Sequence, residues 1–535
     1  MLAVILWGMT AVPHVMAIDL GTSGPKVALI DREGRLIAAE FEPVELLLLP
    51  GGGAEQRPHE WWAAIVKAAR RLLGRGIIDA KQVVAIACTS QWSGTVAVDE
   101  AHEPLHNAII WMDSRGARYV RERVAGWPSI GGYGAASLLR WIRPTGGIPG
   151  LSGKDPVAHI DWLRHERPEI FARAALFLEP KDYLNLRLTG RAAASYDSIA
   201  LHWVTDNRDL KKVGYDDGLL ARAGLDRSQL PELREAVEIL GPVTKKVAAE
   251  LGIGEHVQVV MGTPDVQSAA IGSGGVDDYE AHIYIGTSSW LTCHVPFKKT
   301  DLLRNMAALP SAIPGRYFIA NEQETAGACL SFLRDLLFGS GEDALGGEPA
   351  PADIYRRFDV LAAQVPAGSD GLLFLPWLNG ERSPVDDHRL RGGFLNMSLS
   401  TTRAHLVRAV LEGVAYNSRW LLGAVEHFTG RELGSLRVIG GGANSALWCQ
   451  ILANVCGRTI HQVRDPINAN ARGVGFLALV ALGYLTWHDV GQRVEIADTY
   501  QPESVAQGVY DRMYAEFQAA HRANRTLFHR LNREL

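Results

Sequence analysis

Residues 16–31, MAIDLGTSGPKVALID, predict a β-hairpin with a glycine-rich turn. Apolar residues flank Gly21-Thr22-Ser23-Gly24, which is the pattern of a strand, a tight turn and a returning strand. Glycines let backbone amides approach an anion closely, and the Thr22 and Ser23 hydroxyls add donors. Asp19, just before the turn, is placed to hold a divalent metal beside a phosphate. Taken alone, the pattern fits a phosphate-binding hairpin and an ordinary hairpin with a glycine-rich turn equally well.

A second stretch repeats this pattern in the other half of the chain. Residues 282–293 read HIYIGTSSWLTC, an apolar strand that enters Gly286-Thr287-Ser288-Ser289. Two such turns, half a chain apart, predict two similar domains that face one nucleotide. The chain has 535 residues, long enough for two or three domains.

A third stretch, residues 436–457, reads LRVIGGGANSALWCQILANVCG. Its apolar strand ends in Gly440-Gly441-Gly442, and Asn444 or Ser445 then opens a helix that Gly457 closes. A junction of this kind lets a base or a phosphate lie against bare backbone. We therefore expect a nucleotide contact at this junction.

Composition excludes several classes of function. The chain carries 59 acidic and 54 basic residues, for a net charge of -5, which does not suggest a nucleic-acid or anionic-membrane surface. Five scattered cysteines without a CxxC pair fit a reduced cytoplasm without structural disulfides or zinc. The apolar residues 1–12 lack a positive leading region and are too short to span a bilayer. We treat residues 1–15 as an extension or a misassigned start and expect a cytoplasmic protein.

Polar residues that follow a buried strand predict a ligand site. The apolar run 83–88 precedes Gln91, Trp92 and Ser93, at the strand end where α/β proteins bind ligands. In residues 109–115, Trp111, Asp113 and Arg115 alternate, which would place all three on one face of an extended segment. An aromatic face with charged neighbours suits a sugar. Core packing of the tryptophans and a structural ion pair between Asp113 and Arg115 remain the alternative.

Asp265 is the candidate general base. It follows a predicted strand, residues 257–261, and stands where a helix starts. The helix dipole would lower its pKa and keep it ionised, although an ordinary N-cap has the same position. Its place between the two glycine turns favours a catalytic role, because phosphoryl transfer uses one carboxylate to accept the proton of the attacking hydroxyl.

The order of these motifs, from Val15 to about Leu485, resembles the FGGY carbohydrate kinases of the actin-like ATPase superfamily. The resemblance implies an α/β fold of two actin-like (ribonuclease H-like) domains around a central nucleotide cleft. The expected divisions are 16–275 for the sugar-binding domain, 276–495 for the ATP-binding domain and 496–535 for a closing helix. The expected partners are a sugar and ATP, with neither nucleic acid nor membrane, and a homodimer stays open beside a monomer.

The resemblance also implies residue roles. Asp265 is the expected general base, and Asp19 with Asp265 would hold Mg²⁺. The expected sugar-binding residues are Gln91, Trp92, Ser93, Trp111, Asp113 and Arg115. The expected ATP-binding residues are Gly21, Thr22, Ser23, Lys26, Gly286, Thr287, Ser288, Gly327, Gly441, Gly442 and Asn444.

Within the family, the chain is most similar to members that phosphorylate xylulose. It departs from them at Ser93, where they have histidine, and at Val266, where they have asparagine. We therefore expect ATP-dependent phosphorylation of a small sugar, with a ketopentose such as D-xylulose first. The alternatives are another ketose or polyol (ribulose, glycerol, a tetritol or a pentitol), or a non-catalytic nucleotide switch of the same fold.

Overall fold

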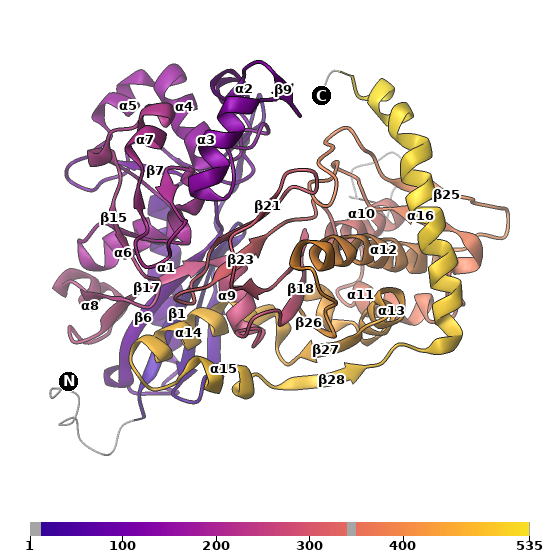
Figure 1. Ribbon diagram of the computed structural model, residues 1–535. Helices are drawn as coiled ribbons and strands as arrows, with labels where there is room; N and C mark the ends of the chain where they lie inside the picture. Colours follow the sequence, from indigo (N-terminus) through magenta and orange to yellow (C-terminus); the bar gives the residue numbers. More distant parts are fainter. Residues whose placement is uncertain (1–11, 340–348, 534–535) are drawn as a thin grey trace.

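The computed structural model describes residues 12–339 and 349–533, and its two main β-sheets lie next to each other (Figure 1). The first sheet has the strand order β16-β17-β6-β1-β2-β3. β1 is antiparallel to β2 and parallel to β6, which is parallel to β17. Its strands are β1 (His14–Gly21), β2 (Gly24–Asp31), β3 (Leu36–Phe41), β6 (Val83–Ser90), β16 (Ile239–Pro242) and β17 (Gln258–Pro264).

The apolar sequence of β1 follows from helices on both faces of the sheet. Met16 and Ile18 pack in the core that includes α1 (Pro58–Gly74), whereas the intervening Ala17 packs in the core that includes α14 (Ala469–Ala481). Successive side chains of a strand point to opposite faces, so a strand covered on both sides is apolar throughout.

The second sheet repeats the centre of the first. Its order is β19-β18-β26-β27-β28, with β18 antiparallel to β19 and parallel to β26, and β26 parallel to β27. A hairpin followed by two parallel strands therefore occurs twice, and the predicted duplication is confirmed. The strands are β18 (Ala281–Ile285), β19 (Ser289–Thr292), β26 (Ser435–Ile439), β27 (Thr459–Val463) and β28 (Ile496–Tyr500).

Strand register brings the functional loops to one edge of each sheet. In the first sheet, Leu20 pairs with Ser90, and Ser90 pairs with Pro264. In the second sheet, Tyr284 pairs with Ile439. The first glycine turn therefore lies beside the segments that begin at Gln91 and Asp265, and the second turn lies beside the triple glycine.

Two helices cross where the domains meet. α9 (Asp265–Gly272) follows β17, and α14 follows β27. A Cβ atom added at Gly272 would overlap the carbonyl oxygen of Ala469, and one added at Gly473 would overlap that of Ser268. The Ser268 hydroxyl donates a 2.7 Å hydrogen bond to the Asn470 carbonyl oxygen. The helices thus touch backbone to backbone, which is possible only because small residues lie at the crossing.

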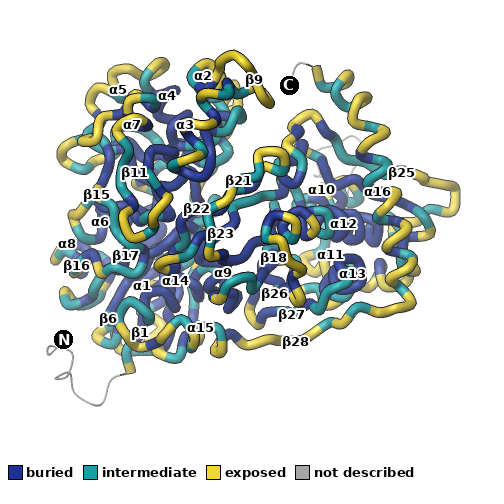
Figure 2. Tube along the Cα trace, in the orientation of Figure 1, coloured by how far each residue is buried: buried dark blue, intermediate teal, exposed yellow. Residues whose placement is uncertain are grey.

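Further helices complete each half. Helices α2–α5 and α7 lie at the upper left of Figure 1, with α6 and α8 below them, and Figure 2 shows the most buried chain in the sheets and in α12 and α14. The first-half helices are α2 (Ala117–Val124), α3 (Ala135–Thr145), α4 (Pro156–Glu166), α5 (Pro168–Arg173), α6 (Pro180–Thr189), α7 (Asp217–Ala223) and α8 (Lys245–Leu251). The second-half helices are α10 (Gly327–Phe338), α11 (Ile354–Ala362), α12 (Arg403–Thr429), α13 (Ala446–Cys456), α15 (Trp487–Arg493) and α16 (Ser504–Leu531).

Short strands form the remaining sheets. A four-stranded sheet has the order β20-β23-β22-β21, and a three-stranded sheet has the order β4-β5-β8. Five two-stranded sheets complete the set among the described residues. The strands of these sheets are β4 (Leu47–Leu49), β5 (Gly53–Gln56), β7 (Val96–Val98), β8 (Ala108–Ile109), β9 (Ser129–Ile130), β10 (Tyr133–Gly134), β11 (Leu176–Leu178), β12 (Ala193–Ser195), β13 (Thr205–Asp206), β14 (Gly214–Tyr215), β15 (Glu232–Arg234), β20 (His294–Val295), β21 (Thr300–Asp301), β22 (Met306–Pro310), β23 (Tyr317–Ala320), β24 (Leu373–Leu375) and β25 (Gly393–Leu395).

The two ends of the chain differ from the sequence expectation. Residues 1–11 of the expected extension lie outside the described residues, but His14 and Val15 belong to β1 and are buried. At the other end, residues 496–500 form β28 rather than part of the closing helix, which starts at Ser504. The division near residue 275 stays a prediction. In the described segments, no helix has both the length and the apolar character that a bilayer span requires.

Candidate active site

Asp265 is the first residue of α9, beside the end of β6. Its Oδ1 accepts a 2.8 Å hydrogen bond from the Val266 backbone N–H. Burial, reinforced by repulsion from Asp19 and, more weakly, from Glu322, raises the pKa of Asp265 to about 8. The expected lowering is therefore wrong, because desolvation and a second carboxylate outweigh the helix dipole. The side chain is still partly accessible to solvent, as a group that meets a ligand must be.

Asp19 supplies the second carboxylate. Its Oδ1 is buried and has no hydrogen-bond partner in the part of the chain that the structure describes. Burial raises the pKa of Asp19, while the Lys26 ammonium and a hydrogen bond with the Asn470 side chain oppose the increase. An unpartnered carboxylate oxygen beside a second carboxylate is the donor set that Mg²⁺ uses when phosphates and water complete its shell.

The first glycine turn is linked to the predicted sugar residues. The Thr22 hydroxyl donates a 3.1 Å hydrogen bond to Gln91 Oε1 and accepts one of 3.0 Å from Trp111 Nε1. Gln91 Nε2 in turn donates to Gln56 Oε1 at 2.7 Å. The structure therefore brings Thr22, Gln91 and Trp111 together.

The rest of this turn faces the other domain and solvent. Ser23 is exposed. Lys26 Nζ donates a 3.0 Å hydrogen bond to the carbonyl oxygen of Ile467, just before α14. The Lys26 ammonium thus joins the first hairpin to the second domain, close to the Asp19 carboxylate.

The second glycine turn is held by the start of α10. The Gly327 N–H donates to the Gly286 carbonyl oxygen at 2.7 Å, and the Ala326 N–H donates to the Thr287 carbonyl oxygen at 2.9 Å. A Cβ atom at Gly327 would overlap the Gly286 oxygen. Thr287 itself is exposed, so its hydroxyl can reach a ligand.

The third glycine segment has the expected junction. After β26, Gly441 and Asn444 are exposed, and Asn444 Nδ2 donates to the Gly441 carbonyl oxygen at 3.2 Å. Ser445 caps α13 by accepting from the Trp448 N–H at 3.0 Å, and Gly457 ends that helix with φ 63°. The predicted helix limits are confirmed, with Ser445 rather than Asn444 as the cap.

Trp92 and Ser93 follow β6 in a strained loop. The indole of Trp92 is largely buried and donates to the Ser198 carbonyl oxygen at 3.0 Å. Ser93 has φ 66°, and its hydroxyl donates to the Lys154 carbonyl oxygen at 2.8 Å. A buried carboxylate, Glu179, accepts a 2.9 Å hydrogen bond from the Gly94 N–H and so holds this loop in place. A left-handed serine persists only where its surroundings impose it, as at ligand sites.

The prediction that residues 109–115 are extended is wrong. β8 ends at Ile109, and the Asp113 N–H bonds back to the Ile110 carbonyl oxygen in a turn. Asp113 is buried and accepts bonds from the Ala54 N–H and from Arg115, whose guanidinium also pairs with Glu55. These groups satisfy one another, so the structural ion pair is the better interpretation, and only Trp111 remains a sugar candidate in this segment.

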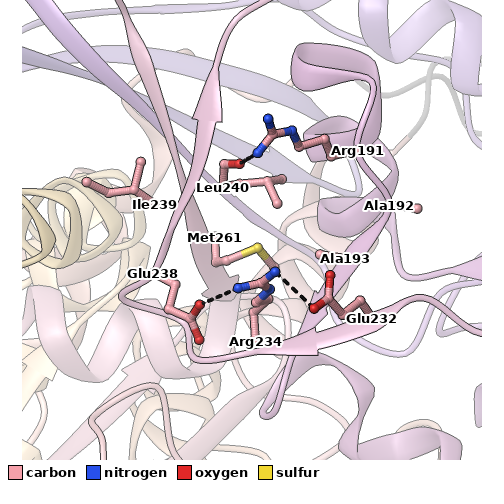
Figure 3. Close-up of a pocket in the computed structure, with 9 residues that line it drawn as sticks. All are labelled: Arg191, Ala192, Ala193, Glu232, Arg234, Glu238, Ile239, Leu240 and Met261. Carbon is pink, nitrogen blue, oxygen red and sulfur yellow. Dashed lines mark hydrogen bonds and ion pairs between the residues drawn. The ribbon is translucent and has the colours of Figure 1, made fainter.

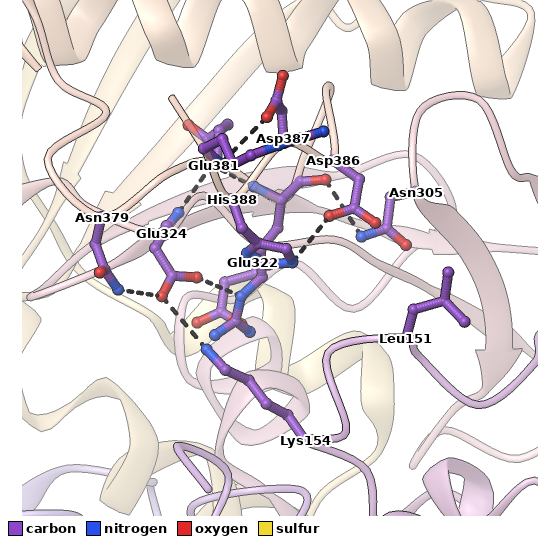
Figure 4. Close-up of polar contacts among 12 residues, drawn as sticks. Leu151, Lys154, Asn305, Glu322, Glu324, Asn379, Glu381, Asp386, Asp387 and His388 are labelled. Carbon is purple, nitrogen blue, oxygen red and sulfur yellow. Dashed lines mark hydrogen bonds and ion pairs between the residues drawn. The ribbon is translucent and has the colours of Figure 1, made fainter. Parts of the chain in front are cut away.

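The sequence did not indicate a charged cluster between the domains (Figure 4). Arg382, on the loop after β24, pairs with Glu322 and Glu324, which follow β23. Lys154 from the first domain lies 3.5 Å from Glu324 Oε1, and Asn379 Nδ2 donates to the same oxygen at 2.9 Å. The sequence did not predict a role for any residue of 377–384, WLNGERSP, because only the fold brings this segment close to Lys154.

A separate cavity of about 370 Å³ lies at the β16 edge of the first sheet, beside β12 and β15 (Figure 3). Arg234 in its wall pairs with Glu232 and Glu238, and Arg191 donates to the Leu240 carbonyl oxygen at 2.8 Å. None of the predicted site residues lines this cavity, so it is distinct from the glycine-turn site.

A duplicated α/β fold, with a carboxylate pair between two glycine turns, defines a two-domain phosphotransferase with actin-like domains. The chain matches the FGGY family of carbohydrate kinases, with the N-terminal domain over residues 14–272 and the C-terminal domain over residues 281–482. Because these matches cover most of its length, the chain belongs to the FGGY family of carbohydrate kinases. The family and fold class predicted from the sequence are confirmed.

Different relatives are named after different substrates. Xylulose kinase from Escherichia coli (strain K12) is 30% identical over 470 residues, 87% of this chain and 90% of that protein. Gluconokinase from Bacillus subtilis (strain 168) is 26% identical over 495 residues, 91% of each chain. The structure of ligand-bound xylulose kinase from Lactobacillus acidophilus has a TM-score of 0.85 at 23% identity, covering 97% of this chain and 100% of the other.

Proposed function

We propose that this carbohydrate kinase transfers the γ-phosphate of ATP to a hydroxyl of a neutral ketose, with D-xylulose as the first candidate. The observation that carries the proposal is the chain of hydrogen bonds from the first glycine turn through Thr22 to Gln91 and Trp111. It joins the predicted phosphate and sugar sites directly. Relatives that are named xylulose kinase support the sugar.

In the proposed mechanism, the sugar lies against Trp111 and Gln91, with its reacting hydroxyl at Asp265. Asp265 accepts the hydroxyl proton as the oxygen attacks the γ-phosphorus, and the bond from the γ-phosphorus to the β–γ bridging oxygen breaks, so that ADP leaves. The Thr287 hydroxyl and turn amides donate to phosphate oxygens during this step. Asp19 and Asp265 would hold Mg²⁺. When bound, the metal would neutralise phosphate charge and favour the ionised form of Asp265.

The charge balance of the cleft argues for a neutral sugar over an aldonate. Lys154 and Arg382 are the basic groups of the interdomain cluster, and Glu322 and Glu324 neutralise them. A carboxylate substrate would need an unbalanced positive charge there. Gluconate, suggested by the gluconokinase relatives, is therefore the second candidate.

The departures at Ser93 and Val266 leave room for another ketose or polyol. Ser93 is shorter than histidine, and Val266 lacks the amide of asparagine, so two hydroxyl-binding groups are absent. A pocket that bonds fewer hydroxyls loses the strong discrimination that an unpaired buried polar group enforces.

The experiment is a comparison of kcat/KM for D-xylulose, D-ribulose, L-xylulose, glycerol, erythritol, pentitols and gluconate, in the wild type and in Ser93→His. We expect ketopentoses to be the preferred substrates and Ser93→His to improve D-xylulose most. If the wild type phosphorylates a polyol or gluconate and no ketopentose, the xylulose assignment is wrong while the family assignment stands.

A further inference from the structure

Arg382 presents an unused hydrogen-bond donor at the junction of the two domains. Its Nε and Nη1 pair with Glu324 and Glu322. In the described part of the chain, the buried Nη2 atom has no hydrogen-bond partner. Buried donors are almost always satisfied, so an orphan at a candidate site calls for a ligand.

The surroundings of this donor belong to the proposed sugar site. The guanidinium carbon lies 5.6 Å from the centre of the Trp111 ring, across the domain boundary. Glu322, which binds Arg382, is also close enough to Asp265 to act on its charge. Nη2 therefore belongs to the region bounded by the proposed aromatic platform and the proposed base.

The loop that carries Arg382 is held in place by its own backbone hydrogen bonds and by side chains of α16. Glu381 and Asp387 exchange two backbone hydrogen bonds, of 3.1 and 2.9 Å. Asp387 Oδ2 is bound in turn by His529 Nε2 at 2.6 Å and by Arg525 Nε at 3.1 Å, both from α16. The donor is therefore held in position without a substrate, which lowers the entropy cost of using it.

We propose that Arg382 Nη2 donates a hydrogen bond to a hydroxyl or carbonyl oxygen of the sugar, so that the second domain helps to bind a substrate held mainly by the first. This inference rests on the proposed function. The acceptor is expected to be neutral, because the two negative charges of Glu322 and Glu324 already balance the two positive charges of Arg382 and Lys154. The sugar itself would then connect Trp111 and Gln91 with Arg382.

The test compares Arg382→Met with Arg389→Met, an exposed arginine of the same loop. We expect Arg382→Met to raise the KM and the calorimetric Kd for the preferred sugar by roughly 10–100-fold, as expected for the loss of a charge-assisted bond. The KM for ATP should change little, and Arg389→Met should behave as the wild type. An unchanged Kd for the sugar in Arg382→Met would overturn the inference.

A series of monodeoxy sugars separates direct binding from a structural role. The wild type should lose affinity for the analogue that lacks the oxygen bound by Nη2, and Arg382→Met should show no further loss for that analogue alone. Equal losses in Arg382→Met across the whole series would make Arg382 structural and overturn the inference. If the wild type phosphorylates no neutral sugar but phosphorylates gluconate, the proposed function fails instead.

Discussion

The two glycine turns share one construction and differ in what they contact. The hydroxyl of Thr22, in the first turn, is engaged with Gln91 and Trp111. Thr287, in the second turn, keeps an exposed side chain, while the carbonyl groups of its turn are fixed by the N–H groups at the start of α10. Duplication therefore produced two phosphate-binding candidates with separate duties. The first is hydrogen-bonded to the proposed sugar-binding residues, and the second presents an exposed hydroxyl from a rigid support.

The largest loss of turnover should follow substitution of Asp265, because neither glycine turn supplies another carboxylate to accept the proton. Asp265→Asn keeps the size of the side chain and removes the proton acceptor, so turnover should fall about 10²–10⁴-fold. ATP affinity, measured by calorimetry, should stay near the wild-type value. Near-normal turnover with saturating sugar would show that Asp265 is not the base.

The matched pair Thr287→Val and Thr22→Val tests the comparison directly. Thr287→Val should lower kcat by about 10²-fold and change ADP affinity little, because its hydroxyl would act where charge builds in the transition state. Thr22→Val should instead raise the KM for the sugar, roughly 10-fold, because Gln91 and Trp111 lose their shared partner. Steady-state kinetics with both substrates varied separates the two patterns. If both variants change the same parameter, the two turns do not have separate duties.

The rigid support of the second turn can be tested at Gly327. Gly327→Ala would push the turn away from α10, costing about 1–3 kcal/mol of stability and weakening ATP binding roughly 10-fold. Gly423→Ala, on the exposed side of α12, has nothing within 4 Å of the added Cβ atom and serves as the control. Wild-type ATP affinity and thermal stability in Gly327→Ala would show that the turn does not depend on this contact.

The smallest expected effect is a change in the pH dependence of stability of the ligand-free protein, caused by the Asp265 carboxyl group. Because the pKa of Asp265 is raised to about 8, the folded state keeps a proton that the unfolded state releases above about pH 4. The wild type therefore loses stability as pH rises from 4 to 8. Asp265→Asn lacks this loss, so its advantage in Tm should grow by a few degrees between pH 5.5 and 8. A difference in Tm that does not change with pH would contradict the raised pKa.

Local sequence was sufficient for the repeated hairpins and for α13. The turn residues, the Ser445 cap and the terminal Gly457 are encoded within a few residues of one another. Asp265 was placed correctly at the start of a helix, but the direction of its pKa shift was predicted wrongly, because burial in the folded chain, reinforced by repulsion from Asp19, outweighs the helix dipole. Propensity carries no information about such a distant charge.

The charged residues of the cleft also show that local sequence does not predict tertiary contacts. Asp113 and Arg115 alternate as surface residues of a strand would, but a turn and Glu55 on β5 make them an internal pair. Arg382 was not singled out from the sequence, because its significance depends on Trp111 and on the Lys154–Glu324 pair, and both Trp111 and Lys154 come from the other domain. Groups assembled by tertiary contacts at large sequence separation could not be identified from the sequence.

The crossing of α9 and α14 has a consequence for the thermodynamics of domain movement. At Gly272 and Gly473 the helices meet through backbone atoms, so these two positions have no side-chain rotamer to change if one domain rotates against the other. One long side chain, Arg472 of α14, does cross the contact and donates a 2.9 Å hydrogen bond to the Gly272 carbonyl oxygen. Ordering a long side chain costs up to about 2 kcal/mol, and a rotation about this contact would avoid that cost at the two glycines. More of the free energy of sugar binding would then remain for orienting the reacting groups.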